Sequence, residues 1–369
     1  MTDRRNEQTE ETMEEKMVTP LLDWYEMNAR SLPWRDDPTP YHVWISEIML
    51  QQTRVEAVKE YYARFTRELP DIAALAQVDE ERLLKLWEGL GYYSRARNLK
   101  KAAVIVMEQY QGRLPRNKEE LIKLPGIGAY TAGAVSSIAY GRKAAAVDGN
   151  VLRVMSRLTG SRENIAAEQV KKRLTERIEA IIPEAFPGAF NQALMDLGAM
   201  VCLPNGEPRC GECPLADLCT AFHQNIQNEL PVKASKKPRR REEKTILVFE
   251  TPQGFLVRKR PERGLLAGMW EFPALEGRQD EETVRRVIGE SGWASDGMTV
   301  LGSAKHIFSH IEWEMQGIYA RLSAPKEGQA AFMDCIPVTW ERLEQEYSVP
   351  AAFDAYRETI RKMRQNSGK

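Results

Sequence analysis

The chain has 369 residues and a net charge of −1 at pH 7, with 52 basic side chains against 53 acidic ones. This length favours two or three domains with separate cores, and the balanced charge excludes a chain that is basic throughout. No apolar run reaches the roughly 18 residues that a membrane-spanning helix requires, and the charged N-terminus, MTDRRNEQTEETMEEK, lacks the apolar core of a signal peptide. We therefore expect a cytoplasmic protein without a membrane partner, and a disordered tail over residues 1–16.

Amphipathic helical patterns fill the chain from about Pro20 to Asn225. EERLLKLWEGL (80–90) and EQVKKRLTERIEAII (168–182) repeat apolar residues at helical spacing, and glycines and prolines separate such runs. No convincing alternating strand pattern interrupts them. The pattern predicts an all-α domain over residues 17–230.

Glu47 lies on an apolar face of one of these predicted helices. It follows Trp44 by three residues and precedes Leu50 by three, so the three side chains share a face. Because burial disfavours the charged form of a carboxyl group, we expect a raised pKa and a proton on Glu47 near neutral pH. A structural glutamate paired with an arginine is the alternative.

The stretch LPGIGAYTAGAV (124–135) places two glycines between two predicted helices. Asn117 as N-cap, with Glu120 three residues later, forms a capping-box pattern for the first helix. Gly126 and Gly128 lack a Cβ, so an anion such as a phosphate can approach the free N–H groups that begin the second helix. An ordinary turn between packed helices is the alternative.

A further predicted helix begins in VDGNVLRVMSRL (147–158), where Asp148 and Asn150 stand at its start. Asp148 has the position of an N-cap, whose carboxylate accepts bonds from free backbone N–H groups. Such a helix end keeps a carboxylate ionised, so a capping role and a chemical role are compatible.

Four of the five cysteines are crowded into one segment with the spacing C-x7-C-x2-C-x5-C: Cys202, Cys210, Cys213 and Cys219. In a cytosolic chain such crowding favours a metal centre over disulfides. Four thiolates suit either a [4Fe–4S] cluster or a structural zinc ion, and unligated thiols are the third possibility. Cys335 stands apart and is expected to be a small buried side chain.

The character of the chain changes after PVKASKKPRRREEK (231–244), a basic linker that is either a solvated tether or a phosphate-contacting one. TILVFETPQGFLVRKR (245–260) predicts a β-hairpin, and GMTVLGSAKHIFSHIEWEMQGIYARL (297–322) predicts more strands. An amphipathic segment, DEETVRRVIGES (280–291), lies between them. Residues 245–369 are therefore expected to form a separate α+β domain.

The combination of LPGIG, AVDGNVLRV and the clustered cysteines resembles the endonuclease III superfamily of base-excision DNA glycosylases. The resemblance implies that Gly126 and Gly128 belong to a helix-hairpin-helix that holds a DNA phosphate, and that Asp148 is the catalytic aspartate. It also implies a [4Fe–4S] cluster module over 202–219, although the first cysteine spacing is one residue longer than the family's C-x6-C. Members that also nick DNA carry a lysine where this chain has Tyr130, and a phenol cannot form the required Schiff base.

SLPWRDDPTPYHVWISEIMLQQTRVEAV (31–58) resembles the MutY-type adenine glycosylases, which remove adenine mispaired with 8-oxoguanine. The resemblance implies that Glu47 is the acid that protonates adenine, that Asp148 stabilises the charged sugar or bonds to it, and that Tyr130 and Asn150 support them. The resemblance also implies that Gln52 and Tyr92 are wedge residues, which fill the gap that the extruded base leaves in the stack. Thr53 and Leu90 are expected near 8-oxoguanine. The expected adenine-pocket residues are Arg30, Trp34, Arg35, Leu50 and Val55. Capping or packing roles are the alternatives for the wedge residues and the 8-oxoguanine neighbours.

GLLAGMWEFP (264–273) and its surroundings resemble the Nudix-like recognition domain of the same glycosylases. Arg286 and Gly289 stand where a working Nudix hydrolase needs metal-binding acids, so metal-dependent hydrolysis is not expected. The resemblance implies that Phe308, Ser309 and His310 contact 8-oxoguanine. Core packing is the alternative for this aromatic and histidine-rich strand.

Together these features predict a multidomain protein: an all-α helix-hairpin-helix glycosylase domain with an iron–sulfur loop, then an α+β Nudix-like domain. We expect a monofunctional adenine DNA glycosylase that acts as a nucleoid-associated monomer on double-stranded DNA. The rival hypotheses are a pyrimidine glycosylase with lyase activity, a catalytically silent DNA-binding or redox-sensing protein, and a nucleotide hydrolase.

Overall fold

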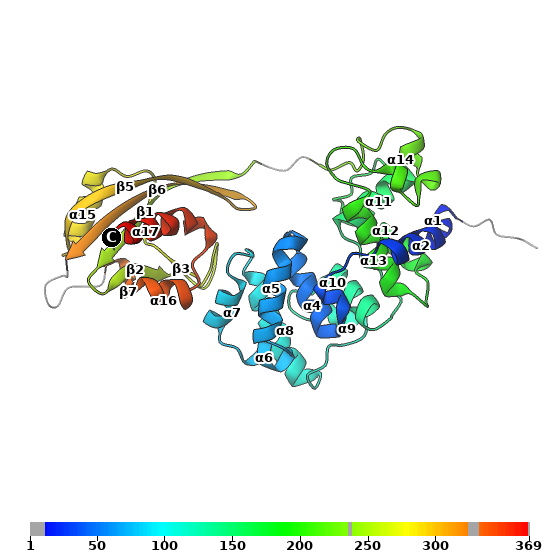
Figure 1. The fold of residues 1–369 in the computed structure, drawn as a ribbon, viewed down its shortest axis with the longest axis horizontal. Helices are drawn as coiled ribbons and strands as arrows, with labels where there is room; N and C mark the ends of the chain where they lie inside the picture. Colours follow the sequence, from blue (N-terminus) through cyan, green and yellow to red (C-terminus); the bar gives the residue numbers. More distant parts are fainter. Residues whose placement is uncertain (1–11, 235–237, 324–331, 368–369) are drawn as a thin grey trace, which may run out of the picture. The chain divides into compact units, whose positions relative to one another are not determined.

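The computed structural model describes residues 12–234, 238–323 and 332–367. These residues form two compact units, of which the first comprises residues up to 77 and from 98 to 234 (Figure 1). The second comprises residues 78–97 and the chain from 238 onward. Among the described residues, none of the helices has the length and apolar character needed to cross a membrane.

The first unit is helical, as the apolar periodicity predicts. Its elements are α1 (Met13–Lys16), α2 (Val18–Asn28), α3 (Pro33–Asp36), α4 (Pro40–Leu50), α5 (Val55–Glu68), α6 (Ile72–Gln77), α8 (Ser94–Gln109, which begins in the second unit), α9 (Lys118–Leu121), α10 (Ala129–Ala134), the π-helix η1 (Val135–Ala139), α11 (Gly149–Thr159), α12 (Glu168–Ile181), α13 (Pro187–Met200), η2 (Cys210–Glu212), η3 (Ala216–Leu218) and α14 (Thr220–His223). One core of this unit is built on α11, which buries Val151, Met155 and Leu158, and on α13, which buries Phe190 and Leu194.

Two local expectations in this unit are wrong. Part of the segment expected as a disordered tail is helix α1, because Thr12 and Glu15 close a capping box around its first turn. The capping box expected between Asn117 and Glu120 does not form: Asn117 precedes α9 without a side-chain cap bond. The Glu120 carboxylate instead accepts bonds from the Tyr110 hydroxyl and the Lys123 ammonium group.

The second unit is built on a seven-stranded sheet in the order β3-β2-β1-β6-β5, with β4 paired to β1 and β7 paired to β2. Its elements are α7 (Glu80–Trp87), β1 (Arg240–Thr251), β2 (Gly254–Lys259), β3 (Trp270–Glu271), β4 (Ala274–Glu276), α15 (Glu281–Glu290), β5 (Ala294–Ile307), β6 (Ile311–Ser323), η4 (Phe332–Asp334), β7 (Ile336–Val338), α16 (Trp340–Gln345), η5 (Ala351–Phe353) and α17 (Asp354–Ser367). The long strands β5 and β6 form an antiparallel hairpin, and β1 runs parallel to β6.

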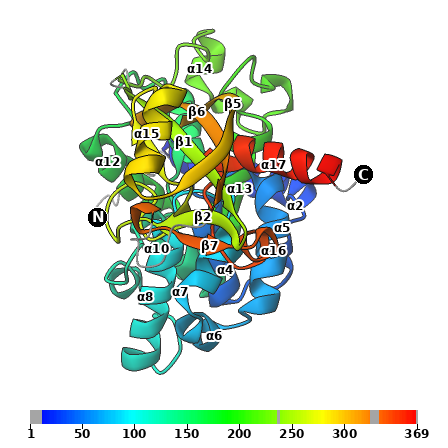
Figure 2. The same cartoon turned by 90° about the vertical axis from the view of Figure 1, so that its left-hand side faces the viewer.

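The sheet separates two cores, with α15 on one face and α17 on the other (Figure 2). Successive residues of β1 point to opposite faces, as the two-residue period of a strand requires. Ile246 accordingly packs with Tyr356 of α17, whereas Leu247 packs with Val284 of α15. The lone Cys335 is buried, as expected, in the core beneath α15.

The expected linker is shorter than its basic composition suggests. Strand β1 begins at Arg240, where pairing with Ile311 of β6 starts, so residues 240–244 belong to the sheet. The sequence RREEK conceals this strand because its side chains are charged and mostly exposed. Lys236 and Lys237 lie outside the described residues, so the proposed phosphate contact of this segment stays a prediction.

Candidate active site

One cavity of about 370 Å³ in the first unit gathers most of the residues that sequence reasoning assigned to chemistry and to the adenine pocket. Its volume lies in the range of roughly 300–1,000 Å³ that is usual for ligand sites. The predicted residues that line it are Arg30, Trp34, Arg35, Glu47, Leu50, Gln52, Thr53, Val55, Tyr130, Asp148 and Asn150. Residues from five elements, α3, α4, α5, α10 and α11, and from the loops beside them therefore converge on one space.

Glu47 is buried near the end of α4, with 6% of its surface exposed. The Tyr130 hydroxyl donates a hydrogen bond of 2.6 Å to its Oε2 atom. Burial raises the pKa of the Glu47 carboxyl to about 7, and the nearby charge of Asp148 acts in the same direction, while the Tyr130 bond acts against it. This carboxyl group can therefore carry a proton at neutral pH.

Asp148 caps the N-terminus of α11, as its position in the sequence predicts. Its Oδ1 atom accepts a bond of 2.8 Å from the Val151 amide, and its Oδ2 atom accepts one of 3.0 Å from the Asn150 side-chain amide. Burial raises the pKa of Asp148, but these bonds to its charged form oppose the rise. The free N–H groups of the helix end also favour a negative charge here. The cavity thus holds two carboxyl groups in different electrostatic surroundings.

Asn150 is fixed in turn by Arg153, a buried residue that sequence reasoning missed. Nη2 of Arg153 donates bonds of 2.8 Å to Oδ1 of Asn150 and to the Gly198 carbonyl. Its Nε atom donates a bond of 2.8 Å to the carbonyl of Cys202. The sequence did contain a signal for this contact, because side chains three residues apart meet on the surface of a helix, and Arg153 follows Asn150 by three.

Arg30 and Arg35 line the cavity, but both are engaged with Asp196, a second residue that sequence reasoning missed. Arg35 forms a fork with bonds of 2.7 and 2.9 Å to the two carboxylate oxygens, and Nε of Arg30 donates a bond of 2.7 Å. Although Asp196 is fully buried, these charges hold its pKa below the usual range. The arginines therefore shape the pocket wall, and neither forms the structural pair with Glu47 that was the alternative for that residue.

The predicted hairpin joins α9 to α10 through Pro125–Gly128. Gly126 has a φ of +78°, and a Cβ at this position would lie 2.7 Å from Cβ of Asn98. Gly128 is the N-cap of α10 with a φ of −91°, and a Cβ there would meet no atom within 4 Å. The first glycine is thus required by the turn, whereas the second leaves the helix start open to solvent.

The predicted wedge residues share an unusual backbone. Gln52, in the first unit, and Tyr92, in the second unit, have φ values of 59° and 48°, although neither is a glycine. Such left-handed residues are uncommon and often occur at functional sites. Tyr92 is half exposed, whereas Leu90, expected beside 8-oxoguanine, is buried.

The predicted 8-oxoguanine loop is the turn between β5 and β6. Phe308 packs against Trp313 with ring centroids 4.9 Å apart, which agrees with the core-packing alternative for this residue. Ser309 and His310 are exposed, and Oγ of Ser309 lies 2.9 Å from the hydroxyl oxygen of Tyr92. A predicted wedge residue and a predicted 8-oxoguanine contact therefore meet within the second unit.

The four clustered cysteines lie in the segment between α13 and α14, and each is half buried. Burial raises the pKa of the Cys210 and Cys213 thiols, and the neighbouring thiols raise them further. Nη1 of Arg157 donates a bond of 3.2 Å to Sγ of Cys202. Among the described residues, no three His, Cys, Asp or Glu side chains surround a single-ion position.

Comparisons with known proteins agree with both predicted domain types. A family model described as "HhH-GPD superfamily base excision DNA repair protein" matches residues 45–180, and a NUDIX domain model matches residues 245–359. The human adenine DNA glycosylase is 34% identical to this chain. The match covers 92% of this chain and 72% of the human protein. The Schizosaccharomyces pombe adenine DNA glycosylase is 32% identical and covers 83% of this chain and 82% of its own length.

A solved structure described as a thermostable thymine-DNA glycosylase is similar to part of this chain. It is 32% identical with a TM-score of 0.53, and the match covers 57% of this chain and 97% of that one. These findings confirm the expected helix-hairpin-helix and Nudix-like architecture and a DNA N-glycosylase activity of base-excision repair.

Proposed function

Because the chain belongs to the adenine DNA glycosylase family, we propose that it hydrolyses the N-glycosidic bond of adenine mispaired with 8-oxoguanine or guanine in duplex DNA. One observation carries this proposal: Glu47 and Asp148 line the same cavity, and the pKa of Glu47 is raised to about 7. Two carboxyl groups in unlike environments can serve as an acid and a charged partner in glycoside hydrolysis.

The reaction begins when Glu47 donates its proton to N7 of an extruded adenine, which turns a poor leaving group into a neutral one. As the bond to the sugar breaks, positive charge develops on the sugar ring. Asp148 stabilises this charge or bonds transiently to the sugar carbon. Glu47, now ionised, then activates the water that completes hydrolysis.

Tyr130 and Asn150 position these two groups. The Tyr130 hydroxyl holds the Glu47 carboxyl, and the Asn150 amide holds one oxygen of Asp148. Burial and the neighbouring carboxyl groups raise the pKa of Tyr130 well above its usual value, so it remains a neutral phenol. A phenol at this position cannot form a Schiff base with the sugar, which supports a monofunctional glycosylase.

Adenine inside a duplex must leave the base stack before it can enter the cavity. Gln52 and Tyr92 are proposed to fill the gap, Thr53 and Leu90 to lie near the opposite base, and Ser309 to contact 8-oxoguanine. The exposed hydroxyl of Ser309, held by Tyr92, supports that role. The 8-oxo group and N7–H of the damaged base offer bonding partners that guanine lacks, so a single hydroxyl can discriminate between them.

The four clustered cysteines are proposed to hold a [4Fe–4S] cluster. Four half-buried thiols within one short segment, with Arg157 bonded to Cys202, fit such a group. When bound, it supplies a rigid loop rather than hydrolytic chemistry, because four thiolates leave no open position for substrate. Broad brown absorbance that acid or reductant bleaches would support this assignment, whereas a colourless protein with stoichiometric zinc would overturn it.

The test uses one duplex with a single adenine opposite 8-oxoguanine and a second with thymine opposite guanine. We expect adenine release from the first duplex, with strand cleavage only after alkali treatment, and no release from the second. Glu47→Gln and Asp148→Asn should abolish release while retaining duplex binding. Cleavage without alkali would indicate a lyase, thymine release would indicate the activity named for the similar solved structure, and binding without release would indicate a silent DNA-binding protein.

A further inference from the structure

Residues 78–97 belong to the helical half by sequence but pack with the C-terminal sheet in the second unit. Their side chains reach the sheet domain at several points. Nζ of Lys85 donates a bond of 3.0 Å to the Tyr347 carbonyl, and Glu81 forms an ion pair of 3.2 Å with Lys259. Nη2 of Arg97 bonds the Ala267 carbonyl at the far end of the segment.

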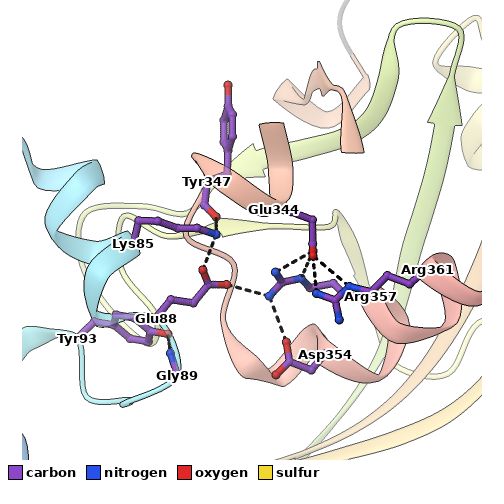
Figure 3. A network of polar contacts seen from close by, with 9 residues as sticks. All are labelled: Lys85, Glu88, Gly89, Tyr93, Glu344, Tyr347, Asp354, Arg357 and Arg361. Atoms are coloured by element: carbon purple, nitrogen blue, oxygen red, sulfur yellow. Dashed lines mark hydrogen bonds and ion pairs between the residues drawn. The ribbon is translucent and has the colours of Figure 1, made fainter. Parts of the chain in front are cut away.

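Arg357 of α17 is the centre of these contacts. It is 7% exposed, and its guanidinium group lies 2.8 Å from Glu88, 2.9 Å from Glu344 and 3.2 Å from Asp354 (Figure 3). Glu88 receives a second cation, because Nζ of Lys85 lies 2.6 Å from its other oxygen. A residue 269 positions away in the chain thus fixes the carboxylate that directly follows α7.

Glu88 begins the loop that carries the predicted DNA-contacting residues. Gly89, Gly91 and Tyr92 all have positive φ, with values of 100°, 68° and 48°. Such a backbone persists only where its surroundings hold it in place. The loop is held at its start by the Glu88–Arg357 pair and followed by Arg97, which bonds the sheet domain.

We propose that Arg357, acting through Glu88, is a positioning residue that fixes the 88–93 loop to the C-terminal domain, so that Tyr92 fills the gap while Ser309 contacts the damaged base opposite it. This inference rests on the proposed function, because that function places Ser309 at 8-oxoguanine and Tyr92 in the gap that the extruded adenine leaves opposite it.

The bond between Tyr92 and Ser309 cannot itself supply this positioning. It is exposed, and a base that bonds to Ser309 competes with the tyrosine hydroxyl for the single donor and two acceptor positions of the serine. An exposed bond of this kind holds the loop only weakly, so a second attachment is needed to keep the loop at its distance from the β5–β6 turn. The buried pair between Glu88 and Arg357 does not compete with the base, so it persists through binding.

The ion network allows this role to be tested without unfolding the protein. If Arg357 loses its charge, Glu88 retains Lys85 and Glu344 retains Arg361, which lies 2.5 Å away. If Glu88 loses its charge, Arg357 retains Glu344 and Asp354. Lys85 then keeps only its bond to the Tyr347 carbonyl, so Arg357→Gln is the milder change, because an unpaired buried charge is what makes a broken buried pair strongly destabilising.

The experiment measures the single-turnover rate of adenine release by the full-length protein, opposite 8-oxoguanine and opposite guanine, for Arg357→Gln, Glu88→Gln and the double variant. Each single change should lower the ratio of the two rates about tenfold, and the double variant should lower it no further, because the two residues act as one unit. Arg357→Lys, which keeps a charge, should recover part of the ratio.

Two variants of α17 serve as controls. Arg361→Gln removes a partner of Glu344 that has no contact with Glu88 in Figure 3, and Arg364→Gln removes an exposed ion pair with Glu341. Both should leave the ratio unchanged, and thermal unfolding should show that every variant is folded.

An unchanged ratio in Glu88→Gln, additive losses in the double variant, or equal losses in Arg361→Gln would overturn the positioning role. If the unaltered protein releases no adenine, or has no preference for 8-oxoguanine, the proposed function fails instead. The two failures are therefore distinguishable.

Discussion

At the scale of single residues, the chemistry depends on the proton that burial places on Glu47. The pKa of this carboxyl is raised to about 7 from an ordinary value of 4.5. The rate of adenine release should therefore fall as pH rises above about 7, tenfold for each further pH unit. Single-turnover rates between pH 5 and 9 would measure this. A rate that rises over the same range would show that Glu47 acts only as a base.

The same shift has a consequence for stability. A carboxyl whose pKa is raised by folding stabilises the protein fully below its unfolded pKa of 4.5, and this contribution is lost as pH rises through 7. The rise from 4.5 to about 7 corresponds to on the order of 3 kcal/mol. Glu47→Gln should consequently gain thermal stability relative to the unaltered protein on going from pH 5 to pH 8. Parallel melting curves across this range would contradict the buried proton.

Gly198 tests how tightly Asp148 must be held. A Cβ at Gly198 would lie 2.6 Å from Cβ of Asn150, whose amide bonds the catalytic carboxylate. The added methyl group should displace Asn150 and, through it, the Asp148 carboxylate. Because a small displacement of a reacting group lowers the reaction rate strongly, Gly198→Ala should slow adenine release on the order of 100-fold while duplex binding is retained. Gly289→Ala in α15, where an added Cβ meets nothing within 4 Å, is the matched control. Equal rates for both variants would show that Asn150 tolerates displacement.

At the scale of elements, the two hairpin glycines have separable roles. Gly126→Ala forces a side chain into positive φ and against Asn98, so it should cost about 1–2 kcal/mol of stability and weaken DNA binding. Gly128→Ala adds a methyl group at the open start of α10, so it should weaken DNA binding without lowering the unfolding temperature. Thermal unfolding and duplex binding at several salt concentrations would separate the two effects. Unaltered binding in both variants would contradict a phosphate site at this hairpin.

Elements with strong periodicity were predictable, and elements set by distant partners were not. The α4 and α11 helices, the cap by Asp148 and the burial of Glu47 follow from local spacing of apolar and capping residues. The start of β1 is concealed by charged side chains, because only its pairing with β6 makes it a strand. The Asn117 cap fails because Glu120 has better partners in Tyr110 and Lys123.

At the scale of the whole molecule, the sequence predicted both kinds of domain but not the packing of residues 78–97. Local amphipathicity makes α7 a helix, but the same pattern fits burial against either unit. Its position in the second unit depends on contacts such as Glu88 with Arg357, which no local pattern contains. The ion pairs of Asp196 were not predicted for the same reason, since its partners Arg30 and Arg35 lie more than a hundred residues away in the chain.

Ser309 tests whether the C-terminal domain contributes to choice of the base pair. Its hydroxyl is exposed at the β5–β6 turn and is held by Tyr92, whereas Phe308 beside it is packed against Trp313. Ser309→Ala should therefore lower the preference for adenine opposite 8-oxoguanine over adenine opposite guanine, because one hydrogen bond to the damaged base is lost. A neutral bond of about 1 kcal/mol corresponds to roughly fivefold.

The rate on the guanine duplex should stay unchanged, since Glu47 and Asp148 lie in the other unit. Ser303→Ala, an exposed serine on β5 away from the turn, controls for loss of a surface hydroxyl. A preference retained by Ser309→Ala would remove this serine from recognition. Because the positioning role proposed for Arg357 depends on Ser309 at the damaged base, that inference would then lose its basis as well.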